Sequence, residues 1–478
     1  MNPRSGSSAS LLGSIDHIVV LMLENRSLDH MLGFLYADQG NVSPAGDPFA
    51  GLTGNEACPD GSGNSVSVYR IGSTTPNAYF MPGADPGEGY AATNDQLYGS
   101  TAAPAAGAVA PMTGFVIDYE SAIAANKRKH WYVVPGTKPE MIMGCYTEQT
   151  LPVLHALAKG YAVCDHWFGS APTMTMPNRA FACAGTSQGH MDDATKTYTV
   201  PSIFGLMSQH NLAWKIYGYK QTPLTKLDFP DTSNADANHF GLFSNFQSDC
   251  ASGSLPAYAF LEPSWNSTGN SQHPNYNVAL GEQLLLDVYN GVSQGPAWNK
   301  TLLIITFDEH GGCYDHVPPP WGATPPDTSV GEFGFGFDRF GPRVPTVLVS
   351  PLIHAGTVFR VPDSATPLDH TSILATIEKR WQLPALTKRD AAAEDVGAVL
   401  SLGQPRTDNP LQGVSAPAAP PIPTALAEQT SHLQEVQAEL IARADGSTAG
   451  VPRSLTTNAQ LEQFISQGSQ SENTPART

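Results

Sequence analysis

The sequence has no apolar run long enough to cross a membrane, and it has little positive charge. Its longest apolar stretches, such as residues 18–23 and 302–307, are far shorter than the roughly 20 residues that a membrane-spanning helix needs. It contains 25 Lys and Arg against 43 Asp and Glu, which gives a formal net charge of −18. Such a surface repels nucleic acid and anionic lipid. We therefore predict no transmembrane segment and no nucleic-acid partner.

Cysteine is sparse, and its pattern excludes one class of metal site. The six cysteines show no C-x-x-C spacing, so a cysteine metal site is not expected. They are Cys58, Cys145, Cys164, Cys183, Cys250 and Cys313. An even number permits disulfides in a secreted protein, and their dilution in a long chain suits buried free thiols equally well.

The N-terminus does not resemble a secretion signal. Residues 1–14 carry one Arg and small polar residues, and the apolar run that follows leads directly into Glu24. A Sec signal needs a longer apolar region and a small-residue cleavage site. We therefore expect a protein that is cytoplasmic or exported by a non-Sec route.

Unbroken apolar strands alternate with helical patterns along the chain. The predicted strands are residues 16–23, 213–217, 301–307 and 344–350, and the predicted helices are residues 151–162 and 278–292. Strands that are apolar throughout and alternate with helices indicate a mostly parallel sheet that is covered by helices on both faces. The sequence therefore predicts an α/β fold.

The composition changes after residue 410. Residues 415–423 read SAPAAPPIP, which is typical of a semi-rigid linker. Apolar residues then recur at near-helical spacing between Leu426 and Ile441. We therefore divide the chain into a main domain, residues 1–410, and a Pro-rich linker with a docked helical tail, residues 411–478.

Two acidic segments directly follow predicted strands. Glu24 and Asn25 come after the first strand, and Asp308 and Glu309 come after residues 301–307. Because ligands bind at the carboxyl ends of strands in open α/β sheets, these four oxygen-bearing side chains should converge. Crowded carboxylates repel one another unless a cation lies between them, and this oxygen-rich set suits a hard or borderline divalent ion. Either pair alone could instead cap the following turn.

Residues 173–179, TMTMPNR, place two hydroxyls before the predicted start of a helix. A helix N-terminus is a favourable seat for phosphate, and a hydroxyl that binds a metal ion there becomes a nucleophile. Arg179 could clamp phosphate oxygens, and Asn178 could donate hydrogen bonds to them. A Thr-Pro-Asn cluster on its own can equally be a plain turn.

Phosphate ester cleavage also needs a proton donor for the leaving oxygen. A histidine is more often structural than catalytic, so most of the fourteen are expected to be structural. His239 and His273 are candidates because they lie in polar loops between predicted strands and helices. His316 shares a loop with Asp308 and Glu309.

Four motifs occur in a fixed order along the chain. They are ENRSLDH at 24–30, TMPNR at 175–179, DEHGGCYDHV at 308–317, and GPRVP at 341–345 followed by Ser-Pro at 350–351. With these motifs, residues 15 to about 381 resemble the phosphoesterase family of bacterial phospholipases C, related acid phosphatases and plant non-specific phospholipases C. The resemblance implies an alkaline-phosphatase-like α/β fold.

The resemblance also implies a set of site residues. One divalent metal ion, Ca, Mg, Mn or Zn, would be bound by Glu24, Asn25, Asp308, Glu309 and the nucleophile. The nucleophile would be Thr175 rather than Thr173, because the family places it two residues before Pro-Asn-Arg. His273 matches a phosphate-side histidine of the family, and His239 matches one less closely.

One motif departs from the family pattern. Many relatives carry Asp-Pro-Gly-His where residues 85–88 read Asp-Pro-Gly-Glu. Glu88 could therefore bind a choline-like cation, hold a second metal ion, or act as a general acid with a raised pKa. The chain also lacks the long C-terminal β-rich extension of the large bacterial phospholipases C.

We expect a metal-dependent phosphoric ester hydrolase of phospholipase C type. Thr175 would attack phosphorus, and water would then hydrolyse a phosphothreonine. The alternatives are a broad-specificity acid phosphatase, which would use the same residues, and a non-catalytic protein that binds phosphorylated ligands. The expected partner is a phosphate ester, which can be a phospholipid head group, and the oligomeric state is not predicted.

Overall fold

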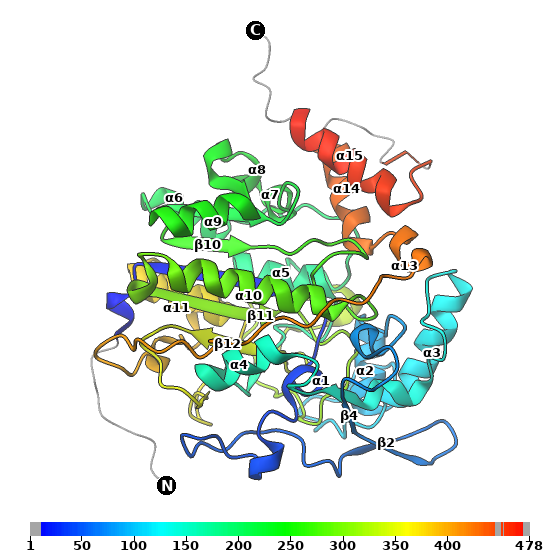
Figure 1. The fold of residues 1–478 in the computed structure, drawn as a ribbon. Helices are drawn as coiled ribbons and strands as arrows, with labels where there is room; N and C mark the ends of the chain where they lie inside the picture. Colours follow the sequence, from blue (N-terminus) through cyan, green and yellow to red (C-terminus); the bar gives the residue numbers. More distant parts are fainter. Residues whose placement is uncertain (1–10, 445–450, 453, 472–478) are drawn as a thin grey trace.

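An eight-stranded sheet lies at the centre of this computed structural model, which describes residues 11–444, 451–452 and 454–471 (Figure 1). Its strands are β1 (His17–Leu23), β6 (Ala162–Cys164), β8 (Trp214–Gly218), β9 (Phe240–Leu242), β10 (Tyr258–Leu261), β11 (Thr301–Phe307), β12 (Thr346–Val349) and β13 (Thr357–Phe359). They lie in the order β13-β6-β12-β11-β1-β10-β8-β9. Neighbouring strands are parallel, except that β12 runs antiparallel to β11 and to β6. The predicted mostly parallel sheet is confirmed.

The strands β1 and β11 are neighbours in the middle of the sheet. They pair in register from His17 opposite Thr301 to Leu23 opposite Phe307. Both are buried throughout, apart from the partly buried His17. Burial on both faces explains why these strands are unbroken apolar runs in the sequence. Because the two strands are parallel and end together, the residues that follow them reach the same edge of the sheet.

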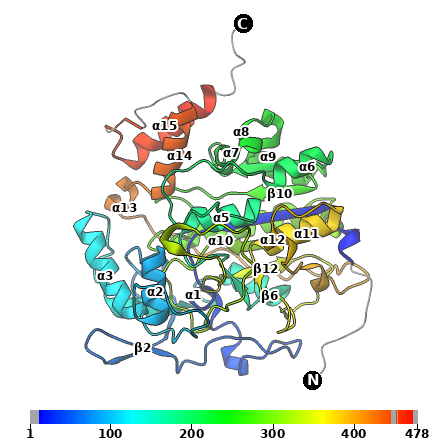
Figure 2. The ribbon, with the colours of Figure 1, turned by 180° about the vertical axis from the view of Figure 1, so that it is seen from behind.

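Helices cover both faces of the sheet. Figure 1 has α4 (Pro152–Gly160) and α10 (Val278–Gln294) in front of it. Figure 2, seen from behind, has α5 (Thr175–Ala184) and α11 (Thr371–Trp381) in front of it. The helix α4 buries Val153, Leu154 and Leu157 on one side, as the spacing of its apolar residues predicts. The α/β fold class is therefore confirmed.

Smaller elements surround this core. The helices are α1 (Leu28–Leu32), α2 (Tyr90–Tyr98), α3 (Phe115–Arg128), α6 (Ile203–Gln209), α7 (Thr225–Asp228), α8 (Pro230–Ser233), α9 (Phe243–Ser252) and α12 (Lys388–Ala391). The short strands are β2 (Ala57–Pro59), β3 (Ser65–Ser67), β4 (Tyr69–Ile71), β5 (Gly144–Tyr146), β7 (Trp167–Phe168) and β14 (Leu368–Asp369). A second apolar cluster, which includes Leu97 of α2 and Phe115 of α3, anchors residues 38–113.

The described part of the C-terminal tail contains three helices. They are α13 (Thr424–Glu428), α14 (His432–Ala444) and α15 (Asn458–Ser471), and they lie together at one end of the molecule (Figure 1). The preceding Pro-rich segment, residues 415–423, contains no helix or strand. The division at residue 410 stays a prediction.

Two sequence observations can be compared with the described part of the chain. All six cysteines are free and buried. In the described ranges, no helix combines the length and apolar character that a membrane crossing requires. Most of the N-terminal stretch on which the secretion prediction rests, residues 1–10, lies outside the described residues.

Candidate active site

The four predicted metal ligands converge at the carboxyl ends of β1 and β11. Glu24 and Asn25 follow β1, Asp308 and Glu309 follow β11, and each is at most 2% exposed. The backbone N–H of Asn25 donates to Asp308 Oδ1 at 2.9 Å. Asn25 has a φ of 57°, a left-handed conformation that asparagine tolerates better than most residues. The turn after β1 thus brings its side chains onto those that follow β11.

The electrostatics of these carboxylates fit a bound cation. Burial raises the pKa of Glu24, and it raises the pKa of Asp308 to about 7 although Arg179 lowers it. Burial and the nearby carboxylates raise the pKa of Glu309 well above its ordinary value. Glu24 Oε2 and Glu309 Oε1 are buried and have no hydrogen-bond partner among the described residues. Buried unpaired oxygens are costly, so these two oxygens are available to a hard or borderline divalent ion. In the described chain the ligand oxygens of Glu24, Asp308 and Glu309 do not all lie within 4.8 Å of one another, so they would have to move closer to share one ion.

Thr175 is the first residue of α5 and reaches the same cluster. Its side chain is fully buried, and its hydroxyl donates to Asn25 Oδ1 at 3.0 Å. The hydroxyl of Thr173, in contrast, donates to the backbone carbonyl of Met191 at 2.6 Å. The structure therefore brings Thr175 to the predicted ligands and places Thr173 in a structural contact.

Arg179 lies one turn along α5 from Thr175 and points at the end of β1. Its Nε donates to Asp308 Oδ2 at 3.0 Å, and its Nη2 donates to the carbonyls of Met22 and Leu23. Its guanidinium lies 4.4 Å from the centre of the Trp265 ring. Only Nη1 is buried without a hydrogen-bond partner in the described chain. Arg179 therefore positions Asp308, and Nη1 is the part of it that remains for a phosphate oxygen.

Asn178 does not have the predicted role. Its side-chain oxygen accepts from the backbone N–H of Ala171 at 3.0 Å, and its Nδ2 donates to the carbonyls of Ala171, Thr173 and Met174. These bonds fix the loop that leads into α5. The sequence interpretation of Asn178 as a donor to phosphate is therefore corrected, because its amide is already fully used.

Glu88 joins the site through Asn25 and His273. Asn25 Nδ2 donates to Glu88 Oε1 at 2.6 Å, and His273 Nε2 lies 3.4 Å from the same oxygen and 3.8 Å from Asp85 Oδ1. Burial would raise the pKa of Glu88, but His273 lowers it to about 2. Burial would lower the pKa of His273, but Asp85 and Glu88 raise it to about 10. Glu88 and His273 thus form an ion pair, which does not fit the general-acid role considered for Glu88.

Arg26 holds the loop that carries His273. It is fully buried, and it donates to the backbone carbonyls of Gln272 at 2.6 Å, His273 at 3.0 Å and Met81 at 2.9 Å. The first motif, residues 24–30, therefore supplies both ligand candidates and the support for the phosphate-side histidine.

Two residues of the site have no counterpart in the sequence analysis. His432, on α14, lies with Nε2 at 2.6 Å from Asp193 Oδ2. Asp193 Oδ1 accepts from the backbone N–H of Met176, next to the nucleophile candidate, at 2.6 Å. His432 and Asp193 are 239 residues apart. No local motif links them, so only the folded chain identifies the pair.

A cavity of about 550 Å³ lies beside this cluster. Its lining includes Asp85, Glu88, Met174, Asp193 and His432. Thr175 is not part of the lining; the cavity reaches only the residue before it. The cavity therefore adjoins the nucleophile candidate on the side of Glu88 and His432.

His239 is not part of the site. It precedes the edge strand β9 and stacks on Trp214, with 4.0 Å between ring centres, and its Nδ1 is 3.0 Å from the Trp214 carbonyl. Trp214 is the first residue of β8, at the opposite end of the strand from the site. The prediction for His239 is therefore wrong, because a polar loop context does not say at which end of the sheet the loop lies.

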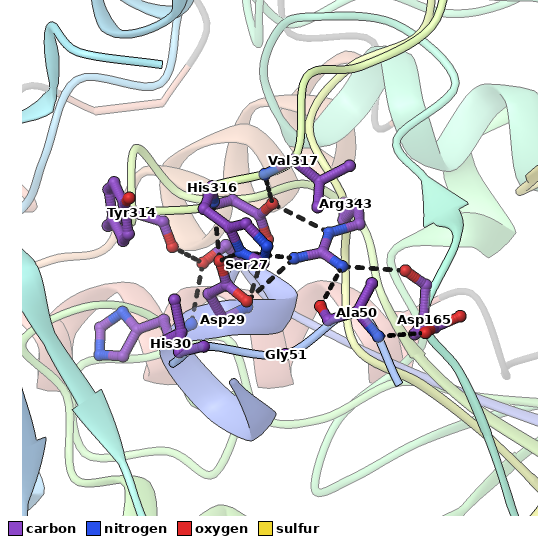
Figure 3. Close-up of polar contacts among 12 residues, drawn as sticks. Ser27, Asp29, His30, Ala50, Gly51, Asp165, Tyr314, His316, Val317 and Arg343 are labelled. Atoms are coloured by element: carbon purple, nitrogen blue, oxygen red, sulfur yellow. Dashed lines mark hydrogen bonds and ion pairs between the residues drawn. The ribbon is translucent and has the colours of Figure 1, made fainter. Parts of the chain in front are cut away.

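His316 belongs to a second acidic cluster, shown in Figure 3. Its Nδ1 is 2.6 Å from Asp29 Oδ2. Arg343 donates through Nη2 to Asp29 Oδ1 and through Nε to Asp315 Oδ1, both at 2.9 Å. The Arg343 guanidinium already occupies the space between the carboxylates. This cluster is therefore a structural ion-pair network.

The same network ties together the two loops that carry the ligand candidates. The Asp29 N–H donates to Asp315 Oδ2 at 3.2 Å, and the His316 N–H donates to Asp29 Oδ2 at 2.7 Å. Ser27 Oγ donates to the carbonyl of Tyr314 at 2.5 Å. The loops after β1 and β11 are thus fixed to each other beyond the strands themselves.

Comparisons with known proteins agree with the motifs. The phosphoesterase family matches residues 15–384. Non-specific phospholipase C6 of Arabidopsis thaliana is 35% identical over 448 residues, which cover 89% of this chain and 79% of that protein. Phospholipase C A of Mycobacterium tuberculosis is 26% identical over 459 residues, which cover 84% of this chain and 80% of that protein.

Similarity to solved structures is lower. A protein in the alkaline phosphatase superfamily from Vibrio parahaemolyticus aligns with 52% of this chain and 64% of its own, at 12% identity and a TM-score of 0.34. The family match covers both strands and loops of the site described above. The chain therefore belongs to the phosphoesterase family and is a phosphoric ester hydrolase.

Proposed function

We propose that the protein is a metal-dependent phosphodiesterase of phospholipase C type with Thr175 as its nucleophile. The observation that carries the proposal is the hydrogen bond from the Thr175 hydroxyl to Asn25 Oδ1, at the N-terminus of α5 and among three buried carboxylates. A hydroxyl in that place faces both a positive helix end and a cation site. A protein that only binds phosphorylated ligands needs no such nucleophile.

The chemistry follows from these positions. Thr175 attacks phosphorus in line with the leaving oxygen, and water then hydrolyses the phosphothreonine, which with a diester substrate still carries the head group. Glu24, Asn25, Asp308 and Glu309 would hold a divalent ion, which would supply positive charge that favours the ionised hydroxyl. Arg179 Nη1 would bind an oxygen of the phosphoryl group, while Nε holds Asp308 in place.

A diester is the favoured substrate class because there is room beside the nucleophile. A phosphodiester carries a second substituent that a monoester lacks, and the cavity of about 550 Å³ next to Glu88 is large enough to hold it. The relatives that match most of the chain are named phospholipases C. A phospholipid head group with its choline or similar cation is therefore the proposed ligand.

The substrate class is tested by assaying p-nitrophenyl phosphorylcholine and p-nitrophenyl phosphate side by side. We expect kcat/KM for the diester to exceed that for the monoester, and diacylglycerol to be released from phosphatidylcholine. A preference for the monoester would instead identify an acid phosphatase. Failure to turn over any phosphate ester, with phosphate binding retained, would identify a binding protein.

Dependence on a metal ion and on the covalent intermediate needs a separate experiment. Chelation should abolish turnover reversibly, and Ca, Mg, Mn and Zn added singly should identify the ion that restores it. Acid quenching during turnover of the diester should trap a peptide that carries phosphate, with the head group still attached, at Thr175. Full activity after complete metal removal would contradict the proposal.

A further inference from the structure

The C-terminal tail shares an apolar cluster with the start of α5, the helix that begins at Thr175. Leu433, Val436 and Ile441 of α14 share an apolar cluster with Met176 and Trp265. Met176 follows Thr175, and Trp265 is the ring that lies against Arg179. A helix from the end of the chain is therefore part of the wall of the site.

Hydrogen bonds add to this packing. Gln437 Nε2 donates to the Thr222 carbonyl at 2.6 Å, and Gln221 Nε2 donates to Gln437 Oε1 at 2.7 Å. Ser267 Oγ donates to the carbonyl of Gln429, just before α14, at 2.8 Å. These contacts fix α14 from both sides, so the side chain that it directs at the cavity has a defined position.

His432 is that side chain. It lines the cavity beside Glu88, and its ring centre is 6.4 Å from that of His273. Asp193 binds Nε2 at 2.6 Å, which leaves Nδ1 as the ring nitrogen available to a ligand in the cavity. This is the arrangement in which a carboxylate orients a histidine for proton transfer.

The surrounding charges favour the protonated form of His432. The groups that act on it are Asp193, Glu88 and His273. Burial would lower the pKa of His432, and His273 lowers it too, but Asp193 and Glu88 raise it to about 9. The imidazole is therefore a cation at neutral pH with a proton to donate.

We propose that His432, supplied by the C-terminal tail and oriented by Asp193, is the catalytic group that protonates the leaving oxygen. The proposal rests on the proposed phosphodiesterase function. It assigns to α14 the proton donor that Glu88, ion-paired with His273, does not provide. The tail would then complete the active site rather than only stabilise the fold.

The proposed steps balance in atoms and charge. Thr175 enters the cycle ionised, its hydroxyl proton having passed to solvent. A bond forms between this alkoxide and phosphorus, the bond from phosphorus to the leaving oxygen breaks, and the proton on His432 Nδ1 moves to that oxygen. In the second step water attacks phosphorus and gives its proton back to Nδ1. The bond from phosphorus to Thr175 then breaks, and the alkoxide and the imidazolium are both restored.

The test compares two leaving groups in His432→Gln, whose amide can still bond to Asp193. Nitrophenolate leaves without a proton, whereas the glycerol alkoxide of a short-chain phosphatidylcholine needs one. We expect kcat/KM for the phosphatidylcholine to fall about 10²-fold or more, in the range of general acid catalysis. For p-nitrophenyl phosphorylcholine kcat/KM should change less than about threefold. Because the second step also loses its base, nitrophenol should appear in a burst of one equivalent per enzyme.

Two controls separate chemistry from tail docking. Gln437→Ala removes the anchoring bonds of α14 but does not reach the cavity, so any loss it causes should be equal for both substrates. In His432→Ala, added imidazole should restore activity on the phosphatidylcholine. An equal loss on both substrates in His432→Gln would overturn the proposal and make His432 an anchor of the tail. A wild-type enzyme that cleaves neither diester would instead refute the proposed function itself.

Discussion

Thr175 and Thr173 lie two residues apart but make different hydrogen bonds, and this difference predicts different roles for the two side chains. The Thr175 hydroxyl donates to Asn25, whereas that of Thr173 donates to the Met191 carbonyl. We expect Thr175→Ala to lower kcat/KM by more than about 10³-fold. Thr173→Ala should keep its activity but lose about 1–3 kcal/mol of stability, because a buried carbonyl loses its donor. Kinetics and thermal unfolding of both variants check this, and the reverse pattern would mean that the nucleophile is Thr173.

Glu88, a carboxylate where many relatives carry a histidine, changes the charge balance of a buried site. The carboxylate is paired with His273 at 3.4 Å and accepts from Asn25 at 2.6 Å, so the cation that such a carboxylate requires is provided by the protein itself. A cationic head group or a second metal ion is not needed to balance Glu88. Glu88 also orients the side-chain amide of Asn25, whose oxygen accepts the hydrogen bond from Thr175.

We therefore expect Glu88→His to reduce activity rather than to change specificity. The change removes the carboxylate that lies 3.4 Å from His273, and a charged imidazole in its place would be repelled by about 4 kcal/mol at about 4 Å and an effective dielectric of about 20, so His273 would lose its ion pair. Rates on p-nitrophenyl phosphorylcholine and p-nitrophenyl phosphate should both fall, with their ratio unchanged within about twofold. A variant that keeps one activity and loses the other would show that Glu88 reads the head group.

At the scale of elements, the sequence predicts those strands and helices that its local apolar pattern determines. The strands β1, β8, β11 and β12 and the helices α4 and α10 follow from apolar runs and spacing, and their bounds agree within a few residues. The three-residue strands β6 and β13 have no such signal, because they exist only through pairing with each other and with β12. The residues at the end of the predicted α4 in fact enter β6.

The candidate site residues also fall into two groups, those that a local pattern predicts and those that it does not. The meeting of Glu24, Asn25, Asp308 and Glu309 at one edge of the sheet could be predicted, because each pair follows a strand that its own sequence predicts. The role of Asn178 could not, since its partners are backbone atoms of a turn whose shape no pattern specifies. Asp193 and His432 meet only through tertiary packing over 239 residues. Side chains that directly follow a strand can be located from the sequence. Side chains that meet through packing between distant elements cannot.

The ion-pair network around Arg343 should contribute strongly to stability. Arg343, Asp29 and Asp315 are fully buried, and they link the loops after β1 and β11. Arg343→Met should cost about 3–5 kcal/mol, because it leaves buried carboxylates without their counter-charge. Arg70→Met, which removes an exposed pair with Asp38, should cost at most about 1 kcal/mol. Denaturant unfolding of both variants measures the two effects, and equal small losses would mean that the network does not hold the loops.

At the scale of the whole molecule, the site is assembled from nearly the full length of the chain. The ligand candidates come from residues 24 to 309, and His432 comes from a helix that follows a Pro-rich segment. A linker of this kind is usually thought of as a boundary between independent parts. Here α14 packs on Met176 and Trp265, so the tail and the residues before 410 contribute to one site.

The net charge predicts how the enzyme meets a lipid surface. At −18, the molecule is repelled by anionic vesicles over about a Debye length, which is about 8 Å at 0.15 M salt and about 30 Å at 0.01 M. Initial rates at 0.01 M salt should therefore be several-fold lower on phosphatidylcholine vesicles that contain an anionic lipid than on pure phosphatidylcholine vesicles, and raising the salt to 0.15 M should reduce the difference. A soluble short-chain phosphatidylcholine controls for direct effects of salt on the site, because it is neutral overall and presents no charged surface. Faster turnover on anionic vesicles at low salt would mean that a local positive surface near the cavity, where Lys129 lies, outweighs the charge of the whole molecule.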